Sequence, residues 1–308
     1  MSGTSQADRV DEATDLFADH RGLLFSIVYG MLGSRADTDD VLQETWLSWS
    51  ARKRSADAGD IENPRAYLIR IAVNRALAQQ AAMNRRRETY IGTWLPEPLV
   101  EPLPEPALSA GTDDAAVRAE AVSMALLVVL ETLTPVERAV FVLNEVFGYA
   151  HTEIAGMLGR SPATVRQHAH RARERVRARR PRFEVDQSLR RRATERFLEA
   201  AIGRDMGALL ELLAPDVTLW TDGGGKAPAA GRRPIRGRDN VARVLVSTRV
   251  RFPPGMGVEY RRVNGNVSAL LFDGDSPFGV LTLDLTADGD RVCGVYAVTN
   301  PDKLVGVN

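Results

Sequence analysis

Leu133–Val176 reads LTPVERAVFVLNEVFGYAHTEIAGMLGRSPATVRQHAHRARERV, and the turn residues inside it decide the fold of this part of the chain. Thr134-Pro135 predicts the start of one helix, and Gly148 predicts its end. A short helix then closes at Gly159, and Ser161-Pro162 caps a second helix after a turn of three to four residues. This spacing predicts a helix-turn-helix.

The second helix has an apolar stripe and a polar face. Val165, Ala169, Ala172 and Val176 recur at i, i+4, i+7 and i+11, which predicts a buried stripe. On the other face, early residues can reach base edges in a major groove, and later arginines suit phosphates. A bidentate Arg–guanine or Gln–adenine pair contributes about 1–3 kcal/mol of discrimination. The candidate duplex-binding residues are Ser161, Ala163, Thr164, Arg166, Gln167, His170, Arg171 and Arg173.

The 308 residues carry 40 basic and 40 acidic side chains, and these are strongly segregated. Residues 1–62 hold 6 basic and 12 acidic side chains, and residues 93–120 hold 1 and 6. Residues 64–92 hold 6 basic and 1 acidic side chain, and residues 160–182 hold 9 and 1. Such blocks indicate nucleic acid at the basic stretches and a protein partner at the acidic ones, with solvated helix faces as the alternative.

Composition excludes several classes of protein. Hydrophobic residues make up 44% and charged residues 26%, as in ordinary globular chains. The single cysteine, Cys293, excludes a disulfide framework and a cysteine-clustered zinc site. The apolar run Met124–Leu130 is too short to cross a membrane, and the polar N-terminus does not resemble a secretory signal. We therefore expect a cytoplasmic protein.

The chain before the helix-turn-helix divides into a helical part and a linker. Residues 9–92 predict helices over His20–Leu32, over Ala36–Arg52 and from Asn63-Pro64 to an arginine triplet. Trp46 and Trp49 can stack on single-stranded bases, but for Trp46 packing in the protein interior is favoured. Residues 93–116 contain five prolines and predict an extended, acidic linker.

From Phe183 the pattern changes to a mixture of helices and strands. Ser188–Ile202 and Asp205–Leu213 predict a helix pair, followed by a strand at Asp216–Thr221 and a helix at Arg238–Arg249. Asn-Gly and Asp-Gly dipeptides then separate several apolar runs, which predicts an antiparallel meander. These observations favour a C-terminal α+β domain.

Several of these segments resemble a known family. DTDDVLQETWLSW (Asp37–Trp49) and NPRAYLIRIAVNRALAQ (Asn63–Gln79) resemble region 2 of extracytoplasmic-function (ECF) RNA polymerase sigma factors, and Leu133–Val176 resembles their region 4. WLPEP (94–98), DGGGK (222–226) and NPDKL (300–304) are similar to hallmarks of the subgroup with a SnoaL-like C-terminal extension. The resemblance implies sigma region 2 at 1–92, a linker at 93–116, region 4 at 117–182 and a cone-shaped SnoaL-like regulatory domain at 183–308.

The resemblance implies a promoter-specificity subunit whose partners are RNA polymerase core enzyme and promoter DNA. Region 2 would bind the polymerase clamp and the −10 element, with the loop before Asn63 capturing bases, and region 4 would bind the −35 element. The implied polymerase-binding residues are Asp39, Asp40, Gln43, Glu44 and Trp46. The implied −10-binding residues are Asn63, Arg65, Arg70, Asn74, Arg85, Arg86 and Arg87.

The C-terminal domain would act in cis in place of a separate anti-sigma protein. The implied regulatory contact joins Trp94, Leu95, Pro96, Glu97 and Pro98 to Asp222, Gly223, Gly224, Gly225 and Lys226. Two other interpretations of the glycine run are an anion-binding nest and a flexible turn. A small-molecule ligand of this domain is a further possible partner, and we expect neither a cofactor nor a metal.

Two other functions stay open at this point. One is a helix-turn-helix regulator that acts on duplex DNA without polymerase, although such a protein needs no segment like NPRAYL. The other is a DNA-tethered SnoaL-type enzyme. All four histidines precede residue 171, so the C-terminal domain has no imidazole for proton transfer. The conceivable acids or bases are Asp222, Tyr260, Asp273, Asp275 and Tyr296.

Overall fold

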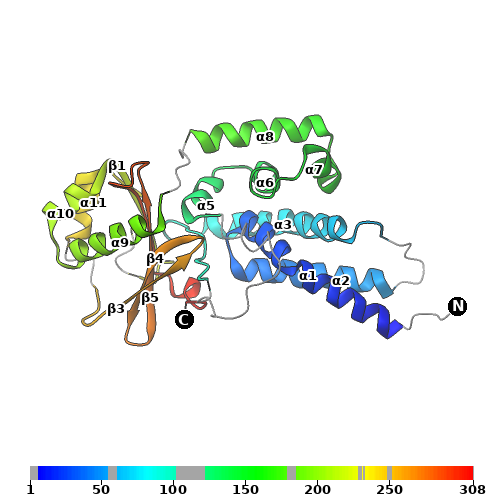
Figure 1. Cartoon of the computed structure of the whole chain (residues 1–308), viewed down its shortest axis with the longest axis horizontal. Coiled ribbons are helices and arrows are strands. Elements are labelled where there is room, and N and C mark those ends of the chain that lie inside the picture. The colour runs from blue at the N-terminus through cyan, green and yellow to red at the C-terminus, as the bar shows by residue number, and fades with distance from the viewer. Residues whose placement is uncertain are drawn as a thin grey trace. The chain divides into compact units, whose positions relative to one another are not determined.

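The computed structural model describes residues 6–54, 61–101, 122–178, 185–227, 231, 233–247 and 252–307 (Figure 1). The chain forms two compact units. The first comprises Met1–Arg85, Gly111–Val122 and Val129–Arg179, and the second comprises Arg86–Ala110, Ser123–Val128 and Arg180–Asn308. The linker residues that follow the arginine triplet therefore belong to the same unit as the C-terminal third of the chain. Within the described residues, no helix is both long and apolar enough to cross a membrane.

The first unit is helical, as the sequence predicts. Its elements are α1 (Gln6–Leu32), α2 (Arg35–Arg54), α3 (Pro64–Glu88, whose last turn enters the second unit), α6 (Pro135–Phe141), the π-helix η1 (Val142–Val146), α7 (His151–Leu158) and α8 (Pro162–Arg177). Trp49 is fully buried, and its indole Nε1 donates to the carbonyl of Ala13 at 2.9 Å. Trp49 is therefore a core residue and cannot stack on a base.

A buried arginine joins the two halves of the first unit. Arg138 of α6 donates through Nε to the carbonyl oxygen of Gly30 in α1 at 3.0 Å, and through Nη1 to Glu131 at 2.6 Å. A Cβ on Gly30 would lie 3.2 Å from Val142, so glycine allows α1 and η1 to approach closely. These hydrogen bonds offset part of the desolvation cost of burying the guanidinium.

The predicted caps set the bounds of the helix-turn-helix. Thr134 and Glu137 form a reciprocal capping box at the start of α6. Gly159 ends α7 in the left-handed conformation at φ 61°, which favours glycine. The Ser161 hydroxyl accepts from the Thr164 backbone N–H at 3.2 Å and starts α8.

The second unit is a six-stranded sheet with most of its helices on one face (Figure 1). Its helices are α5 (Met124–Leu130, whose last residues enter the first unit), α9 (Gln187–Ile202), α10 (Met206–Leu212), α11 (Arg238–Leu245) and the short η2 (Pro301–Lys303). Its strands are β1 (Leu213–Asp222), β2 (Ile235–Arg236), β3 (Gly257–Val263), β4 (Asn266–Asp273), β5 (Ser276–Leu285) and β6 (Val292–Val298), in the order β2-β1-β6-β5-β4-β3.

The predicted meander is present as β3 to β6, each strand antiparallel to the next. The first hairpin turns at Asn264 (φ 51°) and Gly265 (φ 74°), and these two positive φ angles match the expected tight turn. β1 instead pairs in parallel with β6, which the sequence did not predict. A parallel pair needs no local turn, so no Asn-Gly or Asp-Gly signal marks it.

Each face of the sheet carries its own hydrophobic cluster. α9, α10 and α11 cover one face, where Phe197, Leu209 and Val241 pack against the strands. On the other face, Leu95 of the linker and Met124 of α5 pack against strand residues and the C-terminal segment. The linker and the start of α5 are therefore part of the core of the C-terminal domain.

Candidate DNA interface and linker clamp

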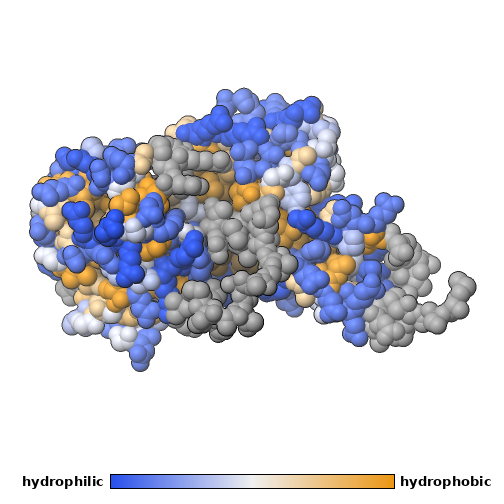
Figure 2. All heavy atoms as spheres, in the orientation of Figure 1, coloured by the Kyte–Doolittle hydropathy of each residue, from blue (hydrophilic) through white to orange (hydrophobic). Residues whose placement is uncertain are grey.

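The recognition helix α8 has the two faces that the sequence predicts. The stripe Val165, Ala169, Ala172 and Val176 is buried. The surface over α8 is almost wholly hydrophilic (Figure 2). The exposed candidates for base or phosphate contact are Ser161, Ala163, Arg166, Gln167, His170 and Arg171, and Thr164 is half-buried. The geometry thus leaves the first turns of α8 open to a duplex, as a recognition helix requires.

Two of the arginines on α8 are held by acidic partners within the helix-turn-helix. Arg173 donates to Glu145 at 2.6 Å and to Asn144 at 2.7 Å. Arg175 donates to the buried Glu137 at 2.5 Å. A carboxylate partner holds the guanidinium in place and neutralises part of the charge that a phosphate would bind. Of the predicted candidates, Arg166 and Arg171 therefore fit direct contact with DNA better than Arg173.

The predicted polymerase-binding face lies on α2. Asp40, Gln43 and Glu44 are exposed along one side, and Asp39 is half-buried with a 3.1 Å contact to Arg21. Arg75 of α3 donates to the Glu44 carboxylate. Trp46 is also half-buried, with its ring centroid 5.5 Å from that of Phe17 in α1. This contact agrees with the interior packing that the sequence favours for Trp46.

The predicted −10 residues at the start of α3 face α7. The Asn63 side chain caps α3 by accepting from the Ala66 N–H at 2.9 Å. Arg65 donates to the Tyr149 hydroxyl at 3.3 Å, and Asn74 Nδ2 donates to the Met157 carbonyl at 3.0 Å. Tyr149 and Met157 were not among the predicted site residues. The loop before Asn63 lies largely outside the described residues.

The remaining basic candidates divide between the two units. Arg70 lies over the Tyr67 ring at 5.2 Å from its centroid. Arg85 and Arg86 are exposed near the end of α3. Arg87 instead lies over the Trp94 ring, with its guanidinium carbon 4.8 Å from the centroid. The arginine triplet is therefore not one uniform phosphate-binding patch.

The fully buried carboxylate of Asp222 holds the linker. It accepts from the backbone N–H of Leu95 at 2.8 Å, from the Lys303 ammonium at 2.7 Å and from the Tyr90 hydroxyl. Asn300 Nδ2 donates to the same tyrosine oxygen at 2.9 Å. We call this group, Tyr90, Leu95, Asp222, Asn300 and Lys303, the linker clamp.

Lys303 is the cation of the linker clamp. Its ammonium also donates to the Leu95 carbonyl and lies 3.3 Å from the centroid of the Trp94 ring. Burial lowers the pKa of Lys303 to about 8, although the charge of Asp222 opposes this shift. Burial and the hydrogen bond to Asp222 raise the pKa of Tyr90, so its hydroxyl stays protonated and can donate. The linker is thus fixed by charge-assisted hydrogen bonds in a water-poor site.

The glycine run lies against this site through Gly224 and Gly225. The Gly224 N–H donates to Asp222 at 3.1 Å. Gly224 has φ +60°, and a Cβ there would lie 2.5 Å from Asn300. A Cβ on Gly225 would lie 3.1 Å from Ile91, which shortly precedes the linker. Lys226 forms an ion pair with Asp302 of the C-terminal segment at 2.6 Å.

The predicted regulatory contact therefore forms through part of each motif. Leu95 and Asp222 touch directly, and Trp94 packs on Lys303. The sequence analysis missed Tyr90, Asn300 and Lys303 as site residues. NPDKL, which contains the last two, was the one signal that pointed to them.

None of the five conceivable acids or bases lines the cavity of the C-terminal domain. Asp222 belongs to the linker clamp, and Tyr296 stacks on Trp220 at 4.8 Å between ring centroids. Tyr260 lies under Arg191. Asp273 and Asp275 are exposed in the β4–β5 turn, where the sequence analysis expected hairpin residues. No group of three or more potential metal ligands occurs within the described residues.

Comparisons with known proteins agree with this geometry. Residues 16–87 match the Sigma-70 region 2 family, and residues 123–176 match the Sigma-70, region 4 family. The ECF RNA polymerase sigma factor SigJ of Mycobacterium tuberculosis (strain ATCC 25618 / H37Rv) is 36% identical over 295 residues, which cover 92% of this chain and 90% of that relative. A probable ECF RNA polymerase sigma factor, SigI, of the same strain is 30% identical over 302 residues, covering 97% and 96%.

A solved structure extends the likeness to the whole chain. The crystal structure of M. tuberculosis SigJ superposes with a TM-score of 0.72 at 34% identity, covering 95% of this chain and 98% of that one. The fold and the two matched regions define a transcription initiation factor with sigma regions 2 and 4. The chain belongs to the ECF RNA polymerase sigma factors. Its third part is a C-terminal α+β domain built on the six-stranded sheet, and the regulator without polymerase is not favoured.

Proposed function

We propose that this chain binds RNA polymerase core enzyme in the cytoplasm, directs promoter-specific initiation and is modulated in cis by its C-terminal domain. The observation that carries the first part is the exposed polar face of α8 on a capped helix-turn-helix, in one unit with α2 and α3. We assign residues 1–92 to region 2, 93–116 to the linker, 117–182 to region 4 and 183–308 to the regulatory domain. The chain itself catalyses no reaction in this proposal.

In this proposal α7 covers the −10 face of α3 in the free protein. Arg65 and Asn74 contact Tyr149 and Met157, so these two side chains are occupied by region 4 rather than by DNA. Binding both promoter elements requires α7 to leave this position. Each of these two hydrogen bonds is exposed or half-buried and contributes little free energy. If the helix-turn-helix moves as one body, the buried hydrogen bond from Arg138 to Gly30 must be released as well.

The linker clamp supports the cis modulation. The linker after α3 is held by Asp222, and the start of α5 packs on the same face of the sheet. Both described ends of the connection between region 2 and region 4 are therefore anchored on the C-terminal domain. A conformational change in this domain can therefore alter how the connection is held, and this needs no separate anti-sigma protein. That the chain has no anti-sigma partner stays a prediction.

Run-off transcription with purified core polymerase and a pool of promoters tests the first part. We expect initiation at one promoter class only when the protein is added. Arg166→Ala with Gln167→Ala should remove most of this activity, because the pair lies on the exposed face of α8. Arg236→Ala, an exposed arginine of β2, is the matched control and should leave it unchanged. Duplex binding without any polymerase-dependent initiation would overturn the proposal.

The cis modulation is tested with point variants of the linker clamp. A truncation near Arg182 would also uncover Leu95 and Met124, whereas Tyr90→Phe removes only one hydroxyl, which donates to Asp222 and accepts from Asn300. We expect Tyr90→Phe to change the transcript yield at constant polymerase and promoter concentration. An unchanged yield in this variant and in Gly224→Ala, with both proteins folded by circular dichroism, would contradict the modulation.

A further inference from the structure

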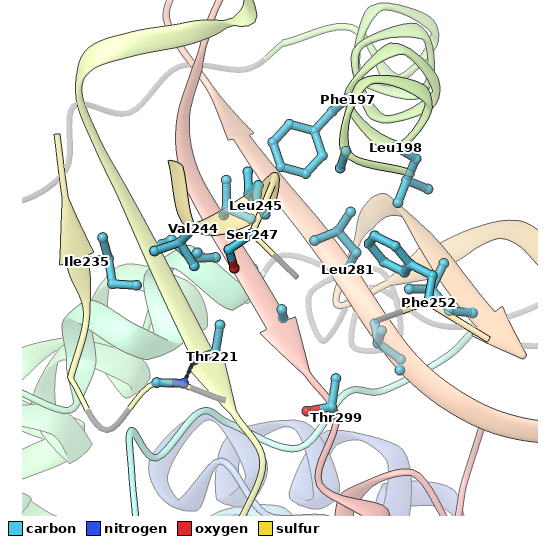
Figure 3. A pocket seen from close by; sticks show the side chains of 18 of the residues that line it. Phe197, Leu198, Thr221, Ile235, Val244, Leu245, Ser247, Phe252, Leu281 and Thr299 are labelled. Atoms are coloured by element: carbon cyan, nitrogen blue, oxygen red, sulfur yellow. Dashed lines mark hydrogen bonds between the residues drawn. The ribbon is translucent and has the colours of Figure 1, made fainter. Parts of the chain in front are cut away.

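The C-terminal domain encloses a cavity of about 490 Å³ between the sheet and the helices α9 and α11 (Figure 3). Most of its described lining is apolar, with Phe197, Leu198, Leu245 and Leu281 among the larger side chains. Arg243 is the one charged residue in this described lining, and it is exposed on the last turn of α11. This volume and this composition are typical of pockets that bind small organic molecules.

Two of the three hydroxyl groups in the described lining lie toward one end of the cavity, whereas Ser247 lies beside Val244 and Leu245 (Figure 3). Thr221 lies one residue before the end of β1 and Thr299 directly follows β6, and Figure 3 shows both on the side away from Phe197 and Leu198. The Thr221 hydroxyl accepts from the Gly231 N–H at 2.6 Å, which leaves its proton directed to another acceptor. The Thr299 hydroxyl donates to the Asp222 carbonyl at 3.3 Å. A ligand can therefore place one acceptor oxygen near Thr221 and its hydrocarbon near α9.

We propose that this cavity binds an uncharged hydrophobic molecule carrying a hydrogen-bond acceptor, such as a ketone or an ester, and that its occupancy acts on the linker clamp. A buried carboxylate on the ligand would lack a buried cation, since Arg243 is exposed. Histidine, lysine, tyrosine and acidic side chains are missing from the described lining, so the ligand is bound without being converted. The effect of the ligand on transcription rests on the proposed cis modulation, whereas the binding of the ligand does not.

The cavity and the linker clamp share two short stretches of chain. Successive side chains of a strand point to opposite faces. Thr221 accordingly lines the cavity while Asp222 faces the linker, and Thr299 is followed by Asn300 of the clamp. The Thr299 N–H also donates to the Asp222 carbonyl at 2.7 Å. A ligand that moves Thr221 or Thr299 must therefore disturb residues bonded to Tyr90.

Binding is measured on the full chain with the uncharged dye N-phenyl-1-naphthylamine, followed by competition with 2-undecanone and with decanoate. We expect saturable fluorescence that 2-undecanone displaces at lower concentration than decanoate. Ala297→Trp places an indole in the cavity and should abolish this signal, whereas Val305→Trp, at a position 77% exposed, should retain it. Thr221→Val should weaken 2-undecanone by about threefold to tenfold, because it loses one hydrogen bond.

Either of two results would overturn the binding. One is a dye fluorescence that does not saturate, or that persists in Ala297→Trp. The other is tighter competition by decanoate than by 2-undecanone, which would make the ligand an anion. The action on the clamp has its own test, because coupling between sites is reciprocal. Tyr90→Phe should change the affinity for 2-undecanone at least threefold, and an unchanged affinity removes the coupling. If binding holds while linker clamp variants leave transcription unchanged, the proposed modulation fails and the ligand site remains.

Discussion

Asp222 and Lys303 form a buried ion pair in the second unit. Both are buried, with side-chain exposures of 0% and 7%. Removing one partner of a buried pair leaves an unpaired charge and costs about 3–5 kcal/mol. We therefore expect Lys303→Met to lower the free energy of unfolding of the second unit by that amount. Denaturant unfolding of the full chain, followed by near-ultraviolet circular dichroism, measures the loss.

The double variant distinguishes a charge effect from a packing effect. Lys303→Met combined with Asp222→Asn leaves no charge in the site, so much of the lost free energy should return. A double variant that is as unstable as the sum of the two single variants would show that the two charges do not interact. Lys226→Met, which breaks the exposed pair with Asp302, is the matched control and should change stability by less than about 1 kcal/mol.

The titration of Lys303 makes stability depend on alkaline pH. Its pKa is lowered from 10.5 to about 8, so between these values the unfolded chain binds one more proton than the folded chain. The free energy of unfolding should then rise with pH, by at most about 1.4 kcal/mol per pH unit. The raised pKa of Tyr90 has the opposite effect above about pH 10. Unfolding at pH 7 to 9.5, relative to the double variant, should show this rise, and parallel curves would exclude it.

At the scale of elements, the capping box of α6 supports the helix-turn-helix. The Glu137 carboxylate accepts from the Thr134 N–H at 3.0 Å and from Arg175 of α8 at 2.5 Å, so one cap stabilises two helices. We expect Thr134→Ala to cost about 1 kcal/mol or somewhat more, measured as a lower melting temperature of the first unit. Thr132→Ala removes an exposed hydroxyl bond to Val129 and should stay within about 0.5 kcal/mol of the wild type. Equal losses in the two variants would contradict the role of the box.

Local signals predicted these elements well because the interactions behind them are local. Thr134, Gly159 and Ser161 act within one turn of their own helices, and the Val165–Val176 stripe follows helical periodicity. Asp222 bonds to Tyr90 and Leu95 across 132 and 127 residues of chain, and no spacing rule reports such pairs. Only the resemblance brought the two motifs together. The parallel pairing of β1 with β6 is non-local in the same way.

At the scale of the whole molecule, the linker depends on the C-terminal domain for its burial. Leu95, Met124 and Ala125 are 0%, 1% and 4% exposed, and their apolar neighbours come from strands and from the last residues of the chain. Arg87 lies over the ring of Trp94, the residue directly before Leu95. A truncation near Arg182 should therefore expose the segment that follows α3, while the caps of α6 and α8 stay in place. The truncated chain would then differ from the full chain in two ways: it lacks the C-terminal domain, and its linker is no longer held by that domain.

Limited trypsin digestion with mass spectrometry measures this release. In the full chain, cleavage after Arg87 should be slow, because the side chain is half-buried and its backbone leads directly into the linker clamp. The truncated chain should be cut there at least tenfold faster, since protease access follows local opening. Cleavage after Lys53, at the end of α2 in the first unit, is the internal control and should keep its rate. Equal rates at Arg87 in both chains would mean that the linker holds its conformation without Asp222 and Lys303, and cis modulation through the clamp would then lose its structural basis.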